Sequence, residues 1–177
     1  MKISTSPAPL AEQKKDALVV FFQGQEVLLP AGNTALEKLA AEYAKNSAFK
    51  GEAGQVGIFP LQNKAAAKQL ILAGIGEAKG FHNALLEQAA AAAIRAGRAA
   101  GLKSFAMASA IKLKGVSQSD YLLLAGRGAG WGTYEFSTFK SGSKKKAAPS
   151  LVFAGAVKDR TAVKAAEAQG EIGRAHV

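Results

Sequence analysis

Short apolar runs alternate with stretches of helical periodicity along most of this 177-residue chain. Residues 16–22 (DALVVFF) form a continuous apolar run with β-branched and aromatic members, which predicts a strand buried on both faces of a sheet. Further apolar runs predict strands at residues 26–29, 55–59, 69–74, 103–108 and 151–157. A short polar stretch joins 55–59 to 69–74, so these two strands are predicted to be a sequential pair.

Helical periodicity fills the intervals between these strands. Apolar residues from Leu36 to Tyr43 recur at the spacing of one helical face, which predicts a helix over residues 33–46. Residues 83–100 are rich in strong helix formers and end before a glycine, as many helices do. Two more helices are predicted to begin near residue 117 or 119 and near residue 159. This order predicts a three-layer α/β domain, with a mainly parallel or mixed central sheet between helices and one antiparallel strand.

Glycines at every second position from 126 to 132 complicate the helix that is predicted to begin near residue 119. Each glycine lowers helix stability by about 1 kcal/mol relative to alanine. Either the helix ends early, or its neighbours pack so closely that only small residues fit. Within this segment Trp131 is predicted to anchor core or interface packing, and the alternative is an anion or stacking contact that involves Arg127 and Trp131.

Composition narrows the class of protein. The chain is 49% hydrophobic and contains no cysteine, and no apolar run approaches the roughly 20 residues that span a bilayer. The first residues lack the apolar core of a signal peptide, so we expect a cytoplasmic protein with no membrane partner. The interpretation favoured for the formal net charge of +10 is a solvated surface rich in lysine, and the alternative is attraction to nucleic acid or another anionic partner. For that alternative, the exposed basic loop predicted around residues 140–149 supplies candidate DNA-contacting residues: Lys140, Lys144, Lys145 and Lys146.

The chain does not offer a complete catalytic set. Its histidines, His82 and His176, lie far apart in the sequence, and none of its three aspartates stands beside another acid. Metal centres usually need ligands at close spacings, so we assign no catalytic, metal-binding or cofactor-binding residue. Gly74-Ile75-Gly76 follows a predicted strand, as phosphate-binding turns do, but the next glycine, Gly80, is one position too late. The interpretation favoured here is that these glycines let the chain turn.

Several stretches are similar to one known family. They are DALVVFFQGQ at 16–25 with Leu29-Pro30, FKGEAGQVGIFP at 49–60 followed by KQLILAGIGE at 68–77, YEFSTFKS at 134–141, and AAEAQGEIGRAH at 165–176. In this order and spacing they resemble the N-terminal domain of the leucyl aminopeptidase (cytosol aminopeptidase) family.

The resemblance implies a macro-domain-like fold for residues 1–158, with 159–177 beginning a linker helix toward a C-terminal catalytic domain. In that family the whole protein is a homo-hexameric hydrolase that removes N-terminal amino acids from peptides. Two divalent metals, Zn or Mn, belong to the catalytic domain, so no catalytic residue is carried over to this chain. Some bacterial members bind DNA. Two alternatives stay open: a basic nucleic-acid-binding module, and a macro-like binder of a nucleotide-derived ligand at the turn of residues 74–80.

Overall fold

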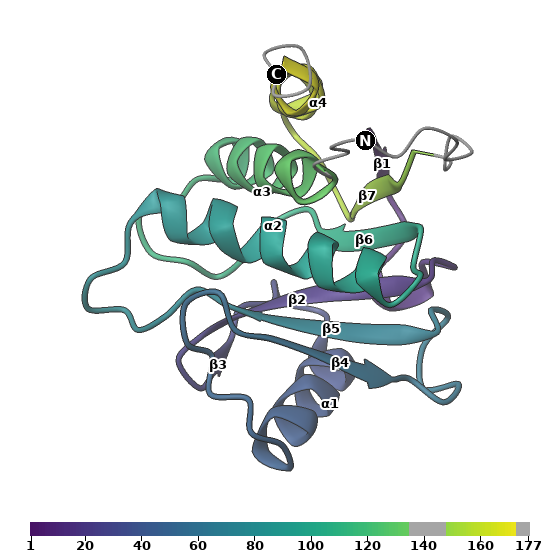
Figure 1. Cartoon of the computed structure of the whole chain (residues 1–177), viewed down its shortest axis with the longest axis vertical. Coiled ribbons are helices and arrows are strands. Elements are labelled where there is room, and N and C mark those ends of the chain that lie inside the picture. Colours follow the sequence, from purple (N-terminus) through teal and green to yellow (C-terminus); the bar gives the residue numbers. More distant parts are fainter. Residues whose placement is uncertain (135–147, 173–177) are drawn as a thin grey trace, which may run out of the picture.

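A central sheet of seven strands separates two layers of helices in the computed structural model, which describes residues 1–134 and 148–172 (Figure 1). Its strands are β1 (Lys2–Ser6), β2 (Ala17–Gln23), β3 (Glu26–Val27), β4 (Val56–Pro60), β5 (Gln69–Gly74), β6 (Ser104–Ala108) and β7 (Ser150–Ala154). Its helices are the 3-10 helix η1 (Leu10–Glu12), α1 (Thr34–Lys45), α2 (Asn83–Ala99), α3 (Gln118–Gly132) and α4 (Arg160–Ile172). The three-layer α/β prediction is confirmed.

The strands lie in the order β1-β7-β6-β2-β5-β4, and β3 pairs with β2. The strands from β1 to β5 in this order run parallel, whereas β4 is antiparallel to β5 and β3 is antiparallel to β2. The predicted pairing of the two strands around residues 55–59 and 69–74 is therefore correct. The sequence indicated one antiparallel strand, and the structure has two because the short β3 folds back onto β2.

Apolar side chains of the central strand pack on both faces, as its continuous run predicts. Val19 and Phe21 belong to the core beneath α2, α3 and α4, and Leu18 and Val20 belong to the core beneath α1. All four are at most 1% exposed. Strand β2 therefore links the two layers of the domain.

The first strand, β1, was not predicted from the sequence. Its residues alternate between exposed and buried, with Ile3 buried and Lys2 exposed, so no apolar run marks it. Pairing with β7 brings Ile3 opposite Leu151. On the open side of β1, the amide of Ile3 donates to the Glu167 carboxylate of α4 at 3.0 Å. Tertiary contacts therefore specify this edge strand, and α4 covers part of its edge.

One set of glycines in α3 lies against α4. A methyl group added at Gly126 would stand 2.6 Å from Cβ of Ala166, and one added at Gly130 would stand 2.7 Å from Cα of Gly170. Both contacts advance by four residues in the same direction, so α3 and α4 run parallel. Small residues four apart on both helices permit this close approach.

The other two glycines lie against α2. A methyl group at Gly128 would stand 2.3 Å from the carbonyl oxygen of Glu87, and one at Gly132 would stand 2.5 Å from that of Ala91. Positions two apart on a helix point about 200° apart, so the alternating pattern consists of two interleaved stripes on opposite faces. The helix does not end early. The second interpretation of this segment, close packing that only small residues permit, is the correct one.

Asp16 joins three strands at the amino ends of the sheet. Its carboxylate accepts from the amides of Lys103 and Ser104 at 2.9 and 3.0 Å and lies 3.4 Å from Nζ of Lys68. These contacts, above all the bond from the Lys103 amide, hold the pKa of Asp16 below its usual value. The ionised carboxylate therefore connects the start of β2 to the residues that precede β5 and begin β6.

We expect the Asp16→Asn substitution to lower the free energy of unfolding at pH 7 by about 1.5–3 kcal/mol, because it removes charge-assisted bonds. A folded-state pKa below the unfolded one stabilises the fold above the unfolded value, and this stability is lost as pH falls through the folded value. Urea unfolding at pH 7 and pH 3 should therefore show a smaller difference for the variant than for the wild type. The exposed control Glu42→Gln should match the wild type at both pH values, and an unchanged pH dependence in Asp16→Asn would refute this role.

Candidate functional site

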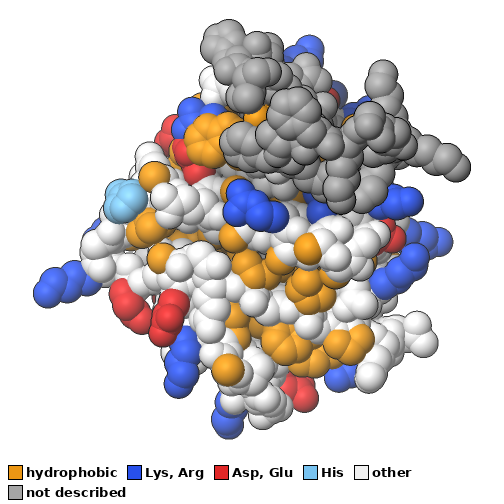
Figure 2. Space-filling view, in the orientation of Figure 1, with side chains coloured by type: hydrophobic (Ala, Val, Ile, Leu, Met, Phe, Trp, Pro, Cys, Tyr) orange, Lys and Arg blue, Asp and Glu red, His pale blue; other side chains and the backbone are white. Residues whose placement is uncertain are grey.

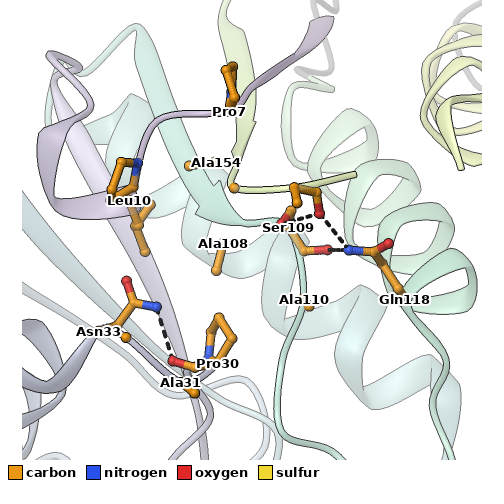
Figure 3. A pocket seen from close by; sticks show the side chains of 14 residues that line it. Pro7, Leu10, Pro30, Ala31, Asn33, Ala108, Ser109, Ala110, Gln118 and Ala154 are labelled. Atoms are coloured by element: carbon orange, nitrogen blue, oxygen red, sulfur yellow. Dashed lines mark hydrogen bonds between the residues drawn. The ribbon is translucent and has the colours of Figure 1, made fainter. Parts of the chain in front are cut away.

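A hollow of about 400 Å3 opens where β6, β7 and β1 end (Figure 3). Ala108 and Ala154, the last residues of β6 and β7, and the following Gly155 line it. The hollow exists partly because these strand ends carry small side chains. Parallel strands direct their carboxyl ends to one edge of a sheet, which is where α/β proteins commonly bind ligands.

The first wall of the hollow is the turn that follows β1. Pro7, Pro9 and Leu10 line this side. The nearly buried amide of Gln13 fixes the turn, since its Nε2 donates to the carbonyl oxygen of Ala8 at 3.0 Å and to Oγ of Ser6 at 3.1 Å. This wall is therefore held in place by side-chain to backbone bonds.

The second wall is the segment from Pro30 to Asn33 that leads into α1. Sequence reasoning placed a capping residue at Asn33 or Thr34. Asn33 does occupy the N-cap position, but its side chain makes no capping bond. Instead, its Nδ2 donates to the carbonyl oxygen of Pro30 at 3.0 Å, which stabilises the wall (Figure 3).

The third wall is a polar network at the start of α3. Nε2 of Gln118 donates to the carbonyl oxygens of Ser109 and Ala156, at 3.2 and 2.9 Å, and Oγ of Ser109 also donates to Ala156 at 3.0 Å (Figure 3). Oε1 of Gln118 accepts from the amide of Lys158 at 3.1 Å. These hydrogen bonds connect the loop after β6 to the loop after β7. The polar side chains of Ser109 and Gln118 therefore stabilise the wall.

A smaller hollow of about 240 Å3 adjoins the first and shares Pro7, Gly155 and Ala156 with it. Its other lining residues include Thr5, Ser6 and Arg160. None of the described residues that line the larger hollow is charged. Among the described residues that line the two hollows, the charged one is Arg160, which is exposed.

Asp159 precedes Arg160 and caps α4. Its Oδ1 accepts from the amides of Thr161 and Ala162, and its Oδ2 accepts from the hydroxyl of Ser119 at 3.0 Å. Bonds from Thr161, followed by the Ser119 hydroxyl, lower the pKa of Asp159 below its usual value. The predicted helix start near residue 159 is confirmed.

The candidates taken from the sequence lie elsewhere. Lys140, Lys144, Lys145 and Lys146 fall outside the described residues. At the glycine turn, a methyl group on Gly74 would stand 2.2 Å from the carbonyl oxygen of Glu52. The amide of Gly76 donates to the carbonyl oxygen of Gly51 at 3.0 Å, so it is engaged within the fold. The turn interpretation of these glycines is confirmed.

Arg127 and Trp131 form a stacking contact on α3. The Arg127 guanidinium lies 5.4 Å from the centre of the Trp131 ring, and its Nη2 pairs with the carboxylate of Glu87 on α2. Trp131 is 42% exposed. Its predicted core role is therefore wrong, whereas an interface role stays a prediction. The sequence offered no signal for the Glu87 partner, because the contact depends on how α2 and α3 pack.

No three His, Asp or Glu side chains converge within the described parts of the chain. His82 is exposed and occupies the N-cap position of α2, and His176 lies outside the described residues.

Burial raises the pKa of Tyr121, whose ring packs between Phe21 and Phe153 in the core. Helices long and apolar enough to cross a membrane are not found among the described residues either.

Comparisons with known proteins give a consistent family match. The sequence profile of the cytosol aminopeptidase family, N-terminal domain, matches residues 19–143. A "Probable cytosol aminopeptidase" from Picosynechococcus sp. is 31% identical over 157 residues, which cover 81% of this chain and 30% of the relative. This chain therefore spans about a third of the length of the relative it matches.

Solved structures show the same fold. A mutant of tomato leucine aminopeptidase superposes with a TM-score of 0.67 at 18% identity, covering 94% of this chain and 35% of that one. A macrodomain mutant from Oceanobacillus iheyensis, solved with ADPR, gives a TM-score of 0.65 at 12% identity and covers 94% of this chain and 90% of that one. The macro-domain-like fold expected from the sequence is therefore confirmed.

Proposed function

The chain belongs to the cytosol aminopeptidase family, whose N-terminal domain it matches, and we propose that it is the non-catalytic N-terminal domain of a metal-dependent leucyl aminopeptidase. The observation that carries this proposal is the extent of the match. The family's N-terminal domain covers residues 19–143, whereas the match covers only 30% of the Picosynechococcus relative. The rest of such a protein has room for a separate catalytic domain.

In this proposal the catalytic domain supplies the chemistry. Two divalent metals, Zn or Mn, would activate a water molecule and polarise the scissile carbonyl of a peptide. The role proposed for this chain is a supporting one, because its match is to the family's N-terminal domain over residues 19–143. The domain's contribution is a rigid α/β unit attached to the catalytic part.

We place the boundary between the macro-like domain, residues 1–158, and the start of a linker helix, residues 159–177. The described part of this helix, α4, packs on α3 through Gly170 and covers the edge of β1 through Glu167. A helix anchored in this way would hold the following domain in a fixed direction. We further propose a cytoplasmic homo-hexamer, as the resemblance implies. The location is supported by the similarity to a probable cytosol aminopeptidase.

The purified chain should show no aminopeptidase activity with manganese, zinc or magnesium, because the proposal places the two metals and the catalytic residues in the separate catalytic domain. The assay is hydrolysis of leucine p-nitroanilide, with the metal-free protein as the control and circular dichroism to show that the chain is folded. Metal-dependent turnover that co-purifies with the chain would overturn the non-catalytic assignment.

A second candidate is a nucleic-acid-binding module, which the net charge of +10 supports. Its proposed contacts are Lys140, Lys144, Lys145 and Lys146. On the face seen in Figure 2, the described Lys and Arg side chains are dispersed over the surface. Contacts between lysines and phosphates would bind all DNA sequences similarly and would weaken steeply with salt. Filter-binding titrations of two different DNA sequences, each at two salt concentrations, test both properties. Salt-independent binding would exclude this mode.

A further inference from the structure

We propose that the two adjoining hollows at the strand ends form one binding site for a small planar organic anion. The uncharged body of the ligand would occupy the larger hollow, and its oxyanion would lie at Arg160 in the smaller one. The two spaces share the lining residues Pro7, Gly155 and Ala156, so they lie next to each other. This site is independent of the aminopeptidase assignment.

The larger hollow is suited to an uncharged body. Its volume of about 400 Å3 lies in the range of small-molecule sites. Proline rings on two of its walls, Pro7 and Pro9 on one and Pro30 on the other, offer flat apolar faces to a planar ring. A charged group would find no described counter-ion among the lining residues, so the body that fits here is neutral.

The walls are also preformed. Gln13, Asn33 and Gln118 each bond to backbone carbonyl oxygens at 3.2 Å or less, and each bond fixes a different wall. At Gly155 the backbone has φ +110°, and a methyl group there would stand 2.7 Å from Oγ of Ser109. The hollow is therefore built into the loops, and a ligand would not have to order them on binding.

The anion end has a cation and hydroxyl donors. No described residue pairs with the exposed guanidinium of Arg160, which can bind an oxyanion with two parallel hydrogen bonds. Oγ of Ser6 already accepts from Nε2 of Gln13 and from the amide of Ala8, at 3.1 and 3.3 Å, so its own hydrogen is free to donate. The neighbouring acid, Asp159, is engaged by Thr161 and Ser119 as the cap of α4.

A phosphate and a carboxylate both satisfy this chemistry. The two test ligands are therefore AMP, a nucleoside phosphate, and N-acetyltryptophan, an aromatic carboxylate. Two control ligands represent the parts of AMP: adenosine is its uncharged body without the anion, and inorganic phosphate is the anion without the body. Binding to the purified chain is measured by calorimetry and by ligand-observed NMR. We expect at least one of the two anions to bind more tightly than adenosine or inorganic phosphate.

Two variants test the two halves of the site separately. Arg160→Gln should weaken binding of the anion about tenfold or more, because it removes a charge-assisted contact, while leaving adenosine unaffected. Ala110→Leu, at a half-buried loop position of the larger hollow, should reduce binding of the anion and of adenosine alike. The matched control Arg95→Gln removes the same charge from an exposed position on α2 that lines neither hollow, and it should leave binding unchanged.

Thermal unfolding shows whether each variant is folded before its affinity is measured. Arg160 is exposed, so Arg160→Gln keeps the test informative even if Ala110→Leu disturbs the loop. The proposal is overturned if neither anion binds the wild type. It is equally overturned if Arg160→Gln binds as well as Arg95→Gln, or if inorganic phosphate binds as tightly as AMP, because the larger hollow would then contribute nothing.

Discussion

Replacing Arg127 by methionine is expected to destabilise the domain by about 2–4 kcal/mol, since the change leaves the Glu87 carboxylate buried without its cation. The Glu87 side chain is 8% exposed, and that of Arg127 is 30% exposed. The partial exposure of Arg127 places the effect somewhat below that of a fully buried pair. Arg127 also donates to Oε1 of Gln169 at 3.2 Å, so the same side chain joins α2, α3 and α4. The measurement is urea unfolding at pH 7.

The double variant Glu87→Leu with Arg127→Met tests whether the loss of stability comes from the unpaired Glu87 carboxylate. Because it removes both charges, we expect it to recover much of the stability that Arg127→Met loses. The control Arg95→Gln removes an exposed cation of α2 and should stay within about 0.5 kcal/mol of the wild type. Equal stability of Arg127→Met and the wild type would show that the ion pair does not hold the helices together.

Gly128→Ala is expected to lower the free energy of unfolding by about 2–3 kcal/mol, although alanine favours a helix by about 1 kcal/mol. The added methyl group would stand 2.3 Å from the carbonyl oxygen of Glu87, which is backbone and cannot rotate away. Helices α2 and α3 would have to separate, which would also disturb the pairing of Arg127 with Glu87. Chemical denaturation of the variant and the wild type measures the loss.

A matched substitution on an exposed helix calibrates this result. Ala41→Gly on α1 removes a solvent-facing methyl group, so it reports helix propensity without a packing change and should cost about 1 kcal/mol. If Gly128→Ala instead stabilises the domain by about 1 kcal/mol, the substitution changes helix propensity without a steric clash. That result would contradict the close approach of α2 and α3 at residue 128.

The sequence predicted best those helices and strands whose position is determined by the burial of apolar side chains. The continuous run of β2 and the periodicity of α1 are set by apolar side chains, and both elements occur close to the predicted residues. Strand β1 was missed because its polar residues become a strand only through β7 and Glu167. The glycines of α3 left two interpretations open, since only the neighbouring helices show which stripe each glycine belongs to.

The binding site was harder to predict for the same reason. Its walls come from three separate segments, around Pro7, Pro30 and Gln118, that approach each other only when β1, β7 and β6 lie side by side. Most of its lining residues are small or apolar, and the polar ones come from separate segments of the sequence, so no cluster of reactive side chains marks it. The glycines at 74 and 76 form a local motif that is visible in the sequence, but in the structure their amides donate to carbonyl oxygens of the fold.

The family assignment and the proposed role make one claim about the gene that encodes this chain. Sequencing the DNA downstream of the codon for Val177 tests that claim most directly. The account predicts that the reading frame continues into a larger domain with clustered Asp, Glu and Lys residues suited to two divalent metals. A stop codon immediately after Val177, with no such domain encoded, would contradict the proposal that this chain is the N-terminal part of an aminopeptidase.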